Sequence, residues 1–350
     1  MIIITINILH GISRLLGLLR FLMKLFSVPK PWILVFCLGV APLALLGLGC
    51  KEDATVPVVD FLKTVDIEQP KKIPTDRPYL NVAIGAMISP KETFTNYYQL
   101  LEYLGKELDH DIRLVQRKTY GEINELLGKG EVDIAFICSG PYAAGKARYA
   151  FEILATPQVH GSHFYRAYLI VQKESPFQRL EDLHGKVFAF TDPESNTGYL
   201  VPLFWLREIG ERPETFFGKT LYTYSHDNSI LAVSKGMVDG ASVDGLVWEY
   251  YHAKNSPLTS KTRIIKKSEP FGIPPVVASK HLAPEIKERV RQALFSMHTN
   301  PEGQNILKEL MIDRFEPPKD EWYDRIREML TAATATLPEE KTRVSAKPQR

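Results

Sequence analysis

The chain has 350 residues, of which 45% are hydrophobic and 24% are charged, and this composition excludes a disordered chain, a collagen-like repeat and a disulfide-dense miniprotein. Lys and Arg total 43 against 41 Asp and Glu, but residues 1–49 hold four of the basic residues and no acidic one, so the remainder is weakly acidic. Nucleic acid is therefore not an expected partner, because its binding requires a basic surface.

The N-terminal segment has the order of a secretory signal peptide. Lys24 and Lys30 precede an apolar run over residues 31–49, which ends in small residues directly before Cys50, as at a cleavage site. A signal peptide beginning at Met23 would be compact, so residues 1–22 are either a genuine extension or the product of an upstream start codon. The sequence does not decide between these two origins.

The end of this segment, Leu46-Gly47-Leu48-Gly49-Cys50, resembles a bacterial lipobox, in which the cysteine is lipidated and becomes the mature N-terminus. It departs from the usual pattern at Gly47. The alternatives are an uncleaved anchor, since nineteen apolar residues can span a bilayer, and ordinary secretion. In each case the body is expected in the periplasm or on the outer face of the cytoplasmic membrane. Cys138 is the one cysteine after Cys50, which excludes an internal disulfide framework.

The chain after the leader is expected to contain a tether and a first α/β unit. Residues 50–78 are polar and punctuated by prolines, which predicts an extended tether. From Tyr79 onward, short β-branched or apolar runs alternate with helical patterns. The expected strands are 80–84, 112–115 and 132–137, and the expected helices are about 96–108, about 121–127 and a third from about 141. Such alternation indicates parallel α/β sheets.

A second α/β unit follows, and the chain then becomes helical. The expected strands of this unit are 167–171, 186–190, 220–224, 240–243, 263–265 and 274–279, with helices after Thr197, after Asp227 and over 246–252. Two apolar stripes predict terminal helices that pack in the core, namely Ile286, Val290, Leu294 and Met297, and Trp322, Ile326, Met329 and Leu330. Residues 338–350 have no apolar periodicity and are expected to form a mobile tail.

Polar side chains gather where an expected strand gives way to a helix. After the strand that ends near residue 190, the run Ser195-Asn196-Thr197-Gly198 opens a helix, and the unpaired N–H groups at a helix start bind anions. Alternatively, Ser195 or Thr197 simply caps this helix. Pro202 lies where the helix interior is expected, so the first helical residue is not fixed.

Two further junctions have the same character. His226 lies at the carboxyl end of a strand, where open α/β sheets bind ligands. At the third junction, Ser139 can cap a helix whose first turn accommodates Pro141. Three polar junctions favour one shared anion cleft over three independent caps.

Several segments, taken in order, resemble the periplasmic binding components of phosphonate, phosphite and phosphate ABC importers, the PhnD-like family. These segments are 132–142, 175–186, 192–202, 225–233 and 273–277. The resemblance implies a type II periplasmic-binding-protein fold, in which two α/β lobes are joined by two crossing segments around a ligand cleft. One lobe is expected to comprise residues 79–165 and 275–337, and the other residues 166–274.

The resemblance also implies which residues bind the ligand. A phosphorus oxyanion such as phosphite, phosphate or a simple phosphonate would be held by the side chains and helix starts at Ser195, Asn196, Thr197 and His226. The opposite lobe would close over it with Tyr120, Ser139 and Tyr142. The protein would act as a monomer, without cofactor or metal, and deliver its ligand to an ABC permease served by a separate ATPase subunit.

Departures from the family pattern bear on the substrate. Members that bind an aminoalkyl phosphonate have acidic residues near the positions of Leu246 and Pro274-Pro275 in this sequence, so an aminophosphonate is not expected. Asp244 lies nearby. Its carboxylate either accepts a hydrogen bond from a protonated oxyanion, and repels one without a proton, or caps the following helix.

Other classes of function were weighed on the same residues. A hydrolase would use Ser195, His226 and Asp244 as nucleophile, base and orienting group, but no Gly-X-Ser-X-Gly elbow accompanies them. His160 and His163 have the spacing of metal ligands without a further ligand at suitable spacing, which favours a solvated loop. A ligand sensor reporting to a membrane receptor is the remaining alternative to a transport protein. An enzyme is therefore not expected.

Overall fold

The structure is a computed structural model that describes residues 76–85 and 87–334. The predicted signal peptide, Cys50, nearly all of the predicted tether and the predicted tail lie outside these residues. Among the described helices, none combines the length and apolar character that crossing a membrane requires.

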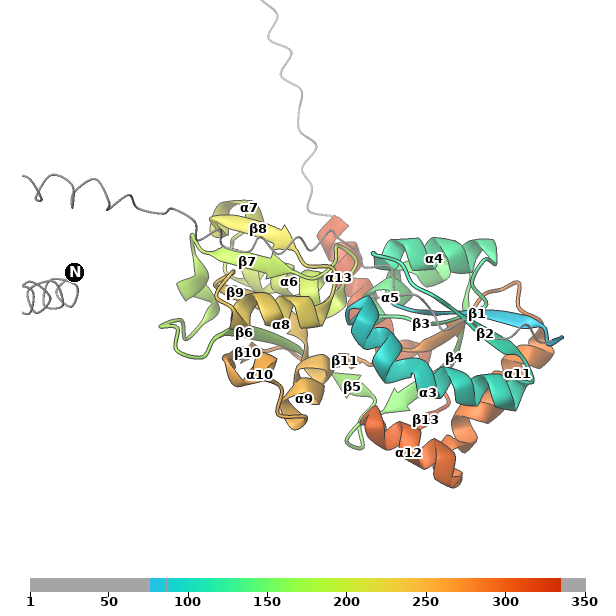
Figure 1. The fold of residues 1–350 in the computed structure, drawn as a ribbon. Helices are drawn as coiled ribbons and strands as arrows, with labels where there is room; N and C mark the ends of the chain where they lie inside the picture. The colour runs from blue at the N-terminus through green and yellow to red at the C-terminus, as the bar shows by residue number, and fades with distance from the viewer. Residues whose placement is uncertain (1–75, 86, 335–350) are drawn as a thin grey trace, which may run out of the picture. The chain divides into compact units, whose positions relative to one another are not determined.

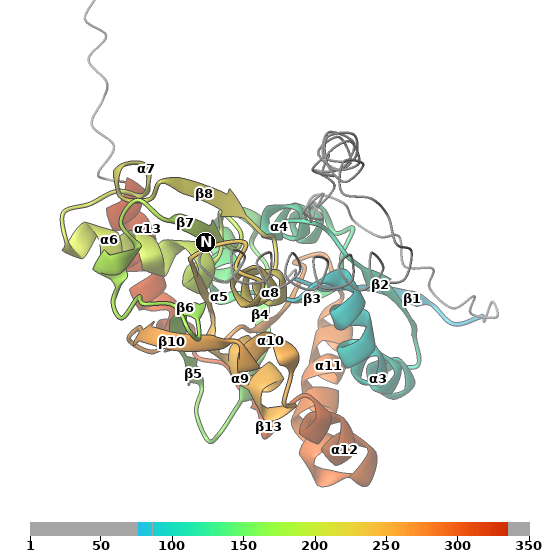
Figure 2. The same ribbon diagram turned by 60° about the vertical axis from the view of Figure 1, so that its left-hand side comes forward.

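The first sheet has six strands in the order β13-β4-β12-β3-β1-β2 (Figure 1). We call this sheet and the helices packed on it lobe 1. Its strands are β1 (Tyr79–Ile84), β2 (Asp111–Val115), β3 (Ile134–Phe136), β4 (Glu152–Gln158), β12 (Val276–Ala278) and β13 (Arg314–Glu316). Its helices are α3 (Pro90–Leu108), α4 (Tyr120–Lys129), α5 (Ser139–Tyr149), α11 (Pro284–Ser296) and α12 (Pro301–Glu309), with the short η3 (Met297–Thr299) between the last two. Helices α11 and α12 pack beside α3, as Figure 2 shows.

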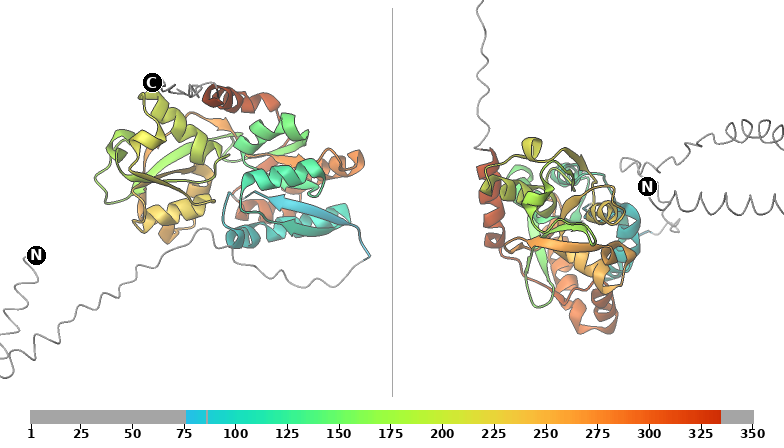
Figure 3. Two further views of the ribbon diagram at one scale, coloured as in Figure 1. Left: turned by 90° about the horizontal axis from the view of Figure 1, so that it is seen from above. Right: turned by 90° about the vertical axis from the view of Figure 1, so that its left-hand side faces the viewer.

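The second sheet has five strands in the order β10-β6-β9-β7-β8 and defines lobe 2. Its strands are β6 (Ala167–Gln172), β7 (Val187–Phe190), β8 (Lys219–Tyr222), β9 (Gly240–Asp244) and β10 (Thr262–Lys267). Its helical elements are η1 (Leu180–Leu183), the π-helical turn η2 (Asn196–Leu200), α6 (Val201–Glu208), α7 (Pro213–Phe216), α8 (His226–Ser234), α9 (Gly245–Ala253) and α10 (Pro257–Ser260). The view from above separates the two lobes (Figure 3).

Two crossing segments join the lobes and pair with each other. Strand β5 (Phe164–Tyr165) leads into lobe 2, and β11 (Phe271–Gly272) returns from it as its antiparallel partner. The crossing segments that the resemblance implies are therefore present. The residue limits that the sequence assigns to the lobes stay predictions.

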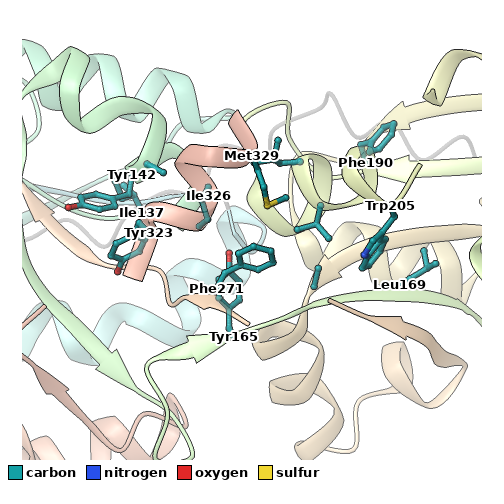
Figure 4. Packing of buried hydrophobic residues seen from close by; sticks show 14 of the residues in the cluster. Ile137, Tyr142, Tyr165, Leu169, Phe190, Trp205, Phe271, Tyr323, Ile326 and Met329 are labelled. Carbon is teal, nitrogen blue, oxygen red and sulfur yellow. The ribbon is translucent and has the colours of Figure 1, made fainter. Parts of the chain in front are cut away.

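The C-terminal part of the described chain also connects the lobes. After η4 (Asp320–Tyr323), helix α13 (Asp324–Thr334) packs on α5 of lobe 1 and on η2 of lobe 2. One buried cluster runs from Tyr142 and Tyr323 through Met329 to Trp205 (Figure 4). Both predicted terminal stripes contribute to the core, since Val290, Leu294, Met297, Ile326 and Met329 are buried.

Both sheets are mixed, whereas the sequence predicts parallel sheets. Strand β1 is parallel to β2 and β3, and β7 is parallel to β8 and β9. By contrast, β12 is antiparallel to β3 and β4, and β6 is antiparallel to β9 and β10. A parallel neighbour requires a crossover within the same sheet. Strands β6 and β12 instead enter from the other lobe, so no such crossover fixes their direction.

Candidate anion-binding site

The carboxyl ends of β7, β8 and β9 lie at one edge of the lobe 2 sheet, because these three strands are parallel neighbours. Each is followed by a helix start, at η2, α8 and α9 respectively. Thr191 Oγ1 after β7 lies 3.1 Å from Nδ1 of His226 after β8. In turn, the backbone N–H of Asp244 at the end of β9 donates to the same nitrogen over 3.0 Å. These three junctions of lobe 2 therefore meet at one place, whereas the third junction that the sequence predicts, at Ser139, belongs to lobe 1.

His226 is held as a neutral donor. A backbone N–H can only donate, so Nδ1 must be unprotonated and the ring hydrogen must sit on Nε2. The ring is fully buried, and desolvation lowers the pKa of His226 to about 3. Its Nε2 has no hydrogen-bond partner among the described residues. The imidazole thus presents one N–H to an acceptor that the described residues do not supply.

The η2 junction separates capping residues from unpartnered ones. Ser195 Oγ accepts from Gly198 N over 3.0 Å, so Ser195 caps the turn as the alternative interpretation expects. Asn196 donates through Nδ2 to the Tyr165 hydroxyl over 3.3 Å, but its Oδ1 is buried without a partner in the described part of the chain. The hydroxyl of Thr197 is fully buried and likewise unpartnered within residues 76–85 and 87–334.

The position of Pro202, which the sequence left unexplained, follows from the π-helical turn. Val201 N donates to Asn196 O, five residues back, and the α-helix proper begins only at Val201. Pro202 is therefore the second residue of α6, where its missing N–H costs little.

Lobe 1 contributes Tyr120. Its backbone N–H donates to Asp192 Oδ2 of lobe 2 over 3.2 Å, and its hydroxyl is buried with no partner among the residues described. Desolvation, together with the charges of Cys138 and Asp192, raises the pKa of Tyr120 well above its ordinary value, so the hydroxyl stays a donor. Ser225 Oγ, directly before His226, is also buried and unpartnered in the described structure; no pattern in the sequence singled it out beyond its place at the junction.

The other two lobe 1 candidates have partners within the protein. Ser139 is the first residue of α5, and its hydroxyl is hydrogen-bonded to that of Tyr165. The prediction that Ser139 caps α5 is wrong, because the cap residue is Cys138, which makes no side-chain capping hydrogen bond. Tyr142 donates to Asp320 Oδ1 over 2.6 Å and contacts the Tyr323 ring edge-on. Its hydroxyl is thus committed to the C-terminal segment.

Asp244 caps α9 and lies beside His226, because its backbone N–H donates to His226 Nδ1. Its Oδ1 accepts from Leu246 N over 2.8 Å and from Val247 N over 3.4 Å. Burial raises the pKa of Asp244 to about 7, despite these two hydrogen bonds, which lower it. The carboxyl is therefore poised to hold or release a proton near neutral pH. The cap role leaves Oδ2 for a ligand, so the two roles that the sequence suggests are compatible.

We define the donor cluster as Tyr120, Thr197 and His226. All three are neutral groups with a hydrogen to donate, contributed by α4, η2 and α8 respectively. Tyr120 and His226 are linked through Met87, because Met87 packs against Tyr120 and its carbonyl accepts from His226 N over 2.9 Å. Neutral donors around a dry site suit an oxyanion, to which they form strong charge-assisted hydrogen bonds.

The lobes are in contact around the cluster. His226 N donates to Met87 O over 2.9 Å, and Ser89 N donates to Asp227 Oδ1 over 2.8 Å. The lobes also approach closely at Gly140, where an added Cβ would lie 2.4 Å from Glu194 O. Contact between the lobes therefore leaves no room for a side chain at this position.

Neither of the two enzymatic or metal arrangements considered from the sequence is formed. In a Ser-His-Asp triad the histidine Nδ1–H donates to the carboxylate, whereas here Nδ1 accepts from a backbone N–H and Asp244 Oδ1 is bound to helix N–H groups. His163 Nε2 lies 2.5 Å from Glu316 Oε2 beside the crossing segment, and His160 is exposed. Within the described residues, no group of three or more His, Cys, Asp or Glu side chains could hold a metal ion.

The architecture is that of a periplasmic binding protein, with two α/β lobes, two crossing segments and a polar site between them. The family model described as the periplasmic substrate-binding protein of the phosphonate ABC transporter matches residues 82–323. The chain belongs to this family of ABC-transporter substrate-binding proteins, as the resemblance implies.

Individual relatives agree with this assignment. The phosphonates-binding periplasmic protein of Escherichia coli is 24% identical over 255 residues, covering 71% of this chain and 75% of the relative. The phosphate-import protein PhnD of Mycolicibacterium smegmatis is 26% identical over 218 residues, covering 59% and 67%.

Solved structures share the fold. The binding component of a Pseudomonas aeruginosa phosphonate transporter has a TM-score of 0.70 at 24% identity, covering 74% of this chain and 87% of that one. PhnD1 of Prochlorococcus marinus, solved with methylphosphonate, has a TM-score of 0.66 at 18% identity, covering 73% and 98%. The predicted type II fold is thereby confirmed.

Proposed function

We propose that this protein captures a small phosphorus oxyanion, such as phosphite, phosphate or a simple phosphonate, between its two lobes and delivers it to an ABC permease. The observation that carries the proposal is the donor cluster, in which three buried donors from both lobes lack partners among the described residues. The protein would act as a monomer held on the outer face of the membrane through a lipidated Cys50, with ATP hydrolysis on a separate subunit.

The cluster explains why ligand binding and closure are coupled. Leaving a buried donor unsatisfied costs about 1–3 kcal/mol, so a closed form without ligand is disfavoured by each member of the cluster. An oxyanion accepts all three hydrogen bonds and removes this cost. Ligand therefore shifts the population toward the closed form, which a permease would recognise.

Acceptors beside the cluster would select the protonation state of the ligand. Asn196 Oδ1 is an unpartnered acceptor in the described chain, and Asp244 lies at the end of β9 with its pKa raised by burial to about 7. A carboxylate accepts a hydrogen bond from the P–OH group of a monoprotonated oxyanion but repels an anion with no proton. Sulfate should therefore bind much more weakly than phosphate or phosphonate.

The test is calorimetric titration of the purified full-length protein with phosphate, phosphite, hypophosphite, methylphosphonate, 2-aminoethylphosphonate and sulfate. At a hundred times its dissociation constant a ligand adds about 2.7 kcal/mol of stability, so thermal shifts provide an independent readout. We expect selective binding of at least one phosphorus oxyanion. His226→Ala should abolish or strongly weaken it, whereas the control His252→Ala, at an exposed position of α9, should not. Wild-type affinity in His226→Ala, or sulfate bound as tightly, would refute the assignment.

A further inference from the structure

A cavity of about 140 Å³ lies between the lobes on the side of the crossing segments. Its walls come from the β1–α3 connection and α3 in lobe 1, from α9 in lobe 2, and from the return segment at Ile273 to Pro275. Apart from Asn96, His160, Asp244 and Glu249, each described residue that lines it is apolar or a tyrosine. The cavity therefore offers mainly hydrocarbon surface.

The cavity adjoins the donor cluster. Asp244 lines it and donates through its backbone N–H to His226 Nδ1. Met87 also lines it, and its carbonyl accepts from His226 N. Ile137 also lines it and directly precedes Cys138, which packs with Met87 against Tyr120. The donor-cluster residues themselves do not line the cavity, but residues of its wall contact both His226 and Tyr120, so the cavity begins beside the cluster.

Three of the four polar residues of the cavity wall are hydrogen-bonded within the protein, and the fourth, His160, is exposed. Asp244 Oδ1 accepts two helix N–H groups, and Glu249 accepts from the Tyr168 hydroxyl, which Lys267 also contacts. Asn96 Oδ1 accepts from the Tyr250 hydroxyl over 2.9 Å. An ammonium group placed here would face hydrocarbon on most sides, and burying such a charge without full pairing is costly.

The volume matches a small hydrocarbon group. A dry apolar cavity of about 150 Å³ in a protein core can hold benzene, and a single water needs far less space than this cavity provides. Phosphite or phosphate in the donor cluster would leave the cavity unfilled by ligand. An alkyl or aryl group would cover the apolar wall and remove it from water, which is favourable in proportion to the area buried.

We propose that the cavity is the substituent pocket of the site and that the ligand is an organophosphonate with an apolar alkyl or aryl group of up to about the size of benzene. This inference rests on the proposed function and narrows it to one ligand class. It assigns Leu246, Val247, Pro274 and Pro275, which line the cavity, the role of selecting an uncharged substituent.

The test compares phosphonates that differ only in the substituent. Calorimetric titration of the full-length protein would use methyl-, ethyl-, n-propyl-, n-butyl- and phenylphosphonate, with 2-aminoethylphosphonate as the charged counterpart of n-propylphosphonate. Each buried methylene should tighten binding by about fourfold. We expect n-propylphosphonate to bind at least tenfold more tightly than both the methyl and the aminoethyl compound. Affinity that falls from methyl to propyl, or aminoethyl bound as tightly as propyl, would overturn the proposal.

A cavity-filling variant has a matched control. Leu246 and Leu258 are both half-buried, and each lies two residues after a helix cap, Asp244 of α9 and Ser256 of α10 respectively. Of these two leucines, Leu246 lines the cavity and Leu258 does not. Leu246→Trp should abolish the gain from methyl to butyl while retaining methylphosphonate, and Leu258→Trp should preserve the gain. If the gain in affinity from methyl- to butylphosphonate is unchanged in Leu246→Trp, the substituent does not bind in this cavity.

The two proposals fail differently. If methylphosphonate or phosphate binds in a His226-dependent manner but longer substituents weaken binding, the substituent pocket is wrong and the anion site stands. If no phosphorus oxyanion binds at all, the proposed function is wrong and the pocket assignment falls with it.

Discussion

The donor cluster and the adjoining cavity lie within one cleft, yet they have opposite surfaces. In the cluster, buried hydroxyl and imidazole groups lack partners among the described residues. In the cavity, the wall is mostly hydrocarbon, and three of its four polar residues are hydrogen-bonded within the protein. The difference indicates that the two regions have separate roles. The cluster would recognise the oxyanion common to all ligands of this class. The cavity would discriminate among the groups attached to phosphorus.

Asp244 stands at the border of the two regions, and Asp244→Asn should produce the largest effect on stability. Burial raises its folded pKa from 3.8 to about 7, so between these values the folded state binds more protons than the unfolded state. Below pH 3.8 the carboxyl is protonated in both states, and the free energy of unfolding is not reduced. It then decreases as the pH rises from 3.8 to about 7, and above about 7 the loss is complete. Asn caps helices as well as Asp does. The variant should therefore be more stable at pH 8, by about 3–4 kcal/mol, and nearly unchanged at pH 4.

Urea unfolding of the ligand-free protein at pH 4, 6 and 8 measures this effect. Asp182→Asn is a control of opposite sign, because hydrogen bonds from the Gln178 backbone and from Arg179 lower the pKa of Asp182. That variant should lose stability at pH 8. Equal stability of wild type and Asp244→Asn at pH 8 would show that Asp244 is ionised without penalty.

Within the cluster, Thr197→Val removes one donor while keeping the shape of the side chain. A hydrogen bond to a charged group contributes about 1.5–3 kcal/mol, so affinity for the bound oxyanion should fall by roughly 10- to 150-fold. The ligand-free protein should lose no stability, since this hydroxyl has no partner in the described structure. The control is Thr259→Val, because Thr259 is also buried in lobe 2 but bonds to Ser256 O. Equal losses of affinity in both variants would contradict a specific role for Thr197.

Closure of lobe 1 over the cluster can be tested at Gly140. A methyl group there would lie 2.4 Å from Glu194 O, and overpacking of this kind costs about 1–3 kcal/mol. Gly140→Ala should weaken all phosphorus oxyanions by a common factor of roughly 5- to 150-fold. The thermal midpoint of the ligand-free protein should stay constant or rise, because alanine favours the helix. A lower midpoint with unchanged affinity would mean that the contact belongs to the resting fold.

Much of the order of elements, and the polar junctions before η2 and α8, could be predicted because they depend on local patterns. Strand-helix alternation locates β1, β7 and β9. Strand β4 was not predicted, and its Pro157 argues against an internal strand. The short strands β5, β11 and β13 were not predicted either, since segments of two or three residues carry no periodicity. Helix α3 begins at Pro90, earlier than the predicted residue 96, because the apolar stripe starts only at Tyr97.

What the sequence could not predict is how hydrogen bonds are distributed among similar polar residues. Ser195 and Thr197 are two positions apart, yet the first caps η2 and the second is left unpartnered among the described residues. Likewise, the Tyr142 hydroxyl bonds to Asp320 in a segment 178 residues further along, whereas the Tyr120 hydroxyl is unpartnered among the described residues. Whether a hydroxyl finds a partner so far along the chain depends on the tertiary structure, which no local pattern encodes.

The smallest effect is expected for Tyr250→Phe, which tests whether a contact between the lobes beside the cavity changes affinity without changing selectivity for the substituent. Tyr250 of α9 donates to Asn96 Oδ1 of α3 over 2.9 Å, a bond between the lobes that is made only when they are in contact. Its loss in Tyr250→Phe should cost about 1 kcal/mol, or roughly a fivefold loss of affinity for each phosphonate. The ring remains in the cavity wall, so the ratio of n-propyl to methyl affinity should not change. The control Tyr103→Phe loses a bond from Asn300 Nδ2 within lobe 1, away from the cavity, and should leave affinity unaffected. A changed ratio in Tyr250→Phe would show that the hydroxyl itself contacts the substituent, and the boundary between the two regions would then have to include Tyr250.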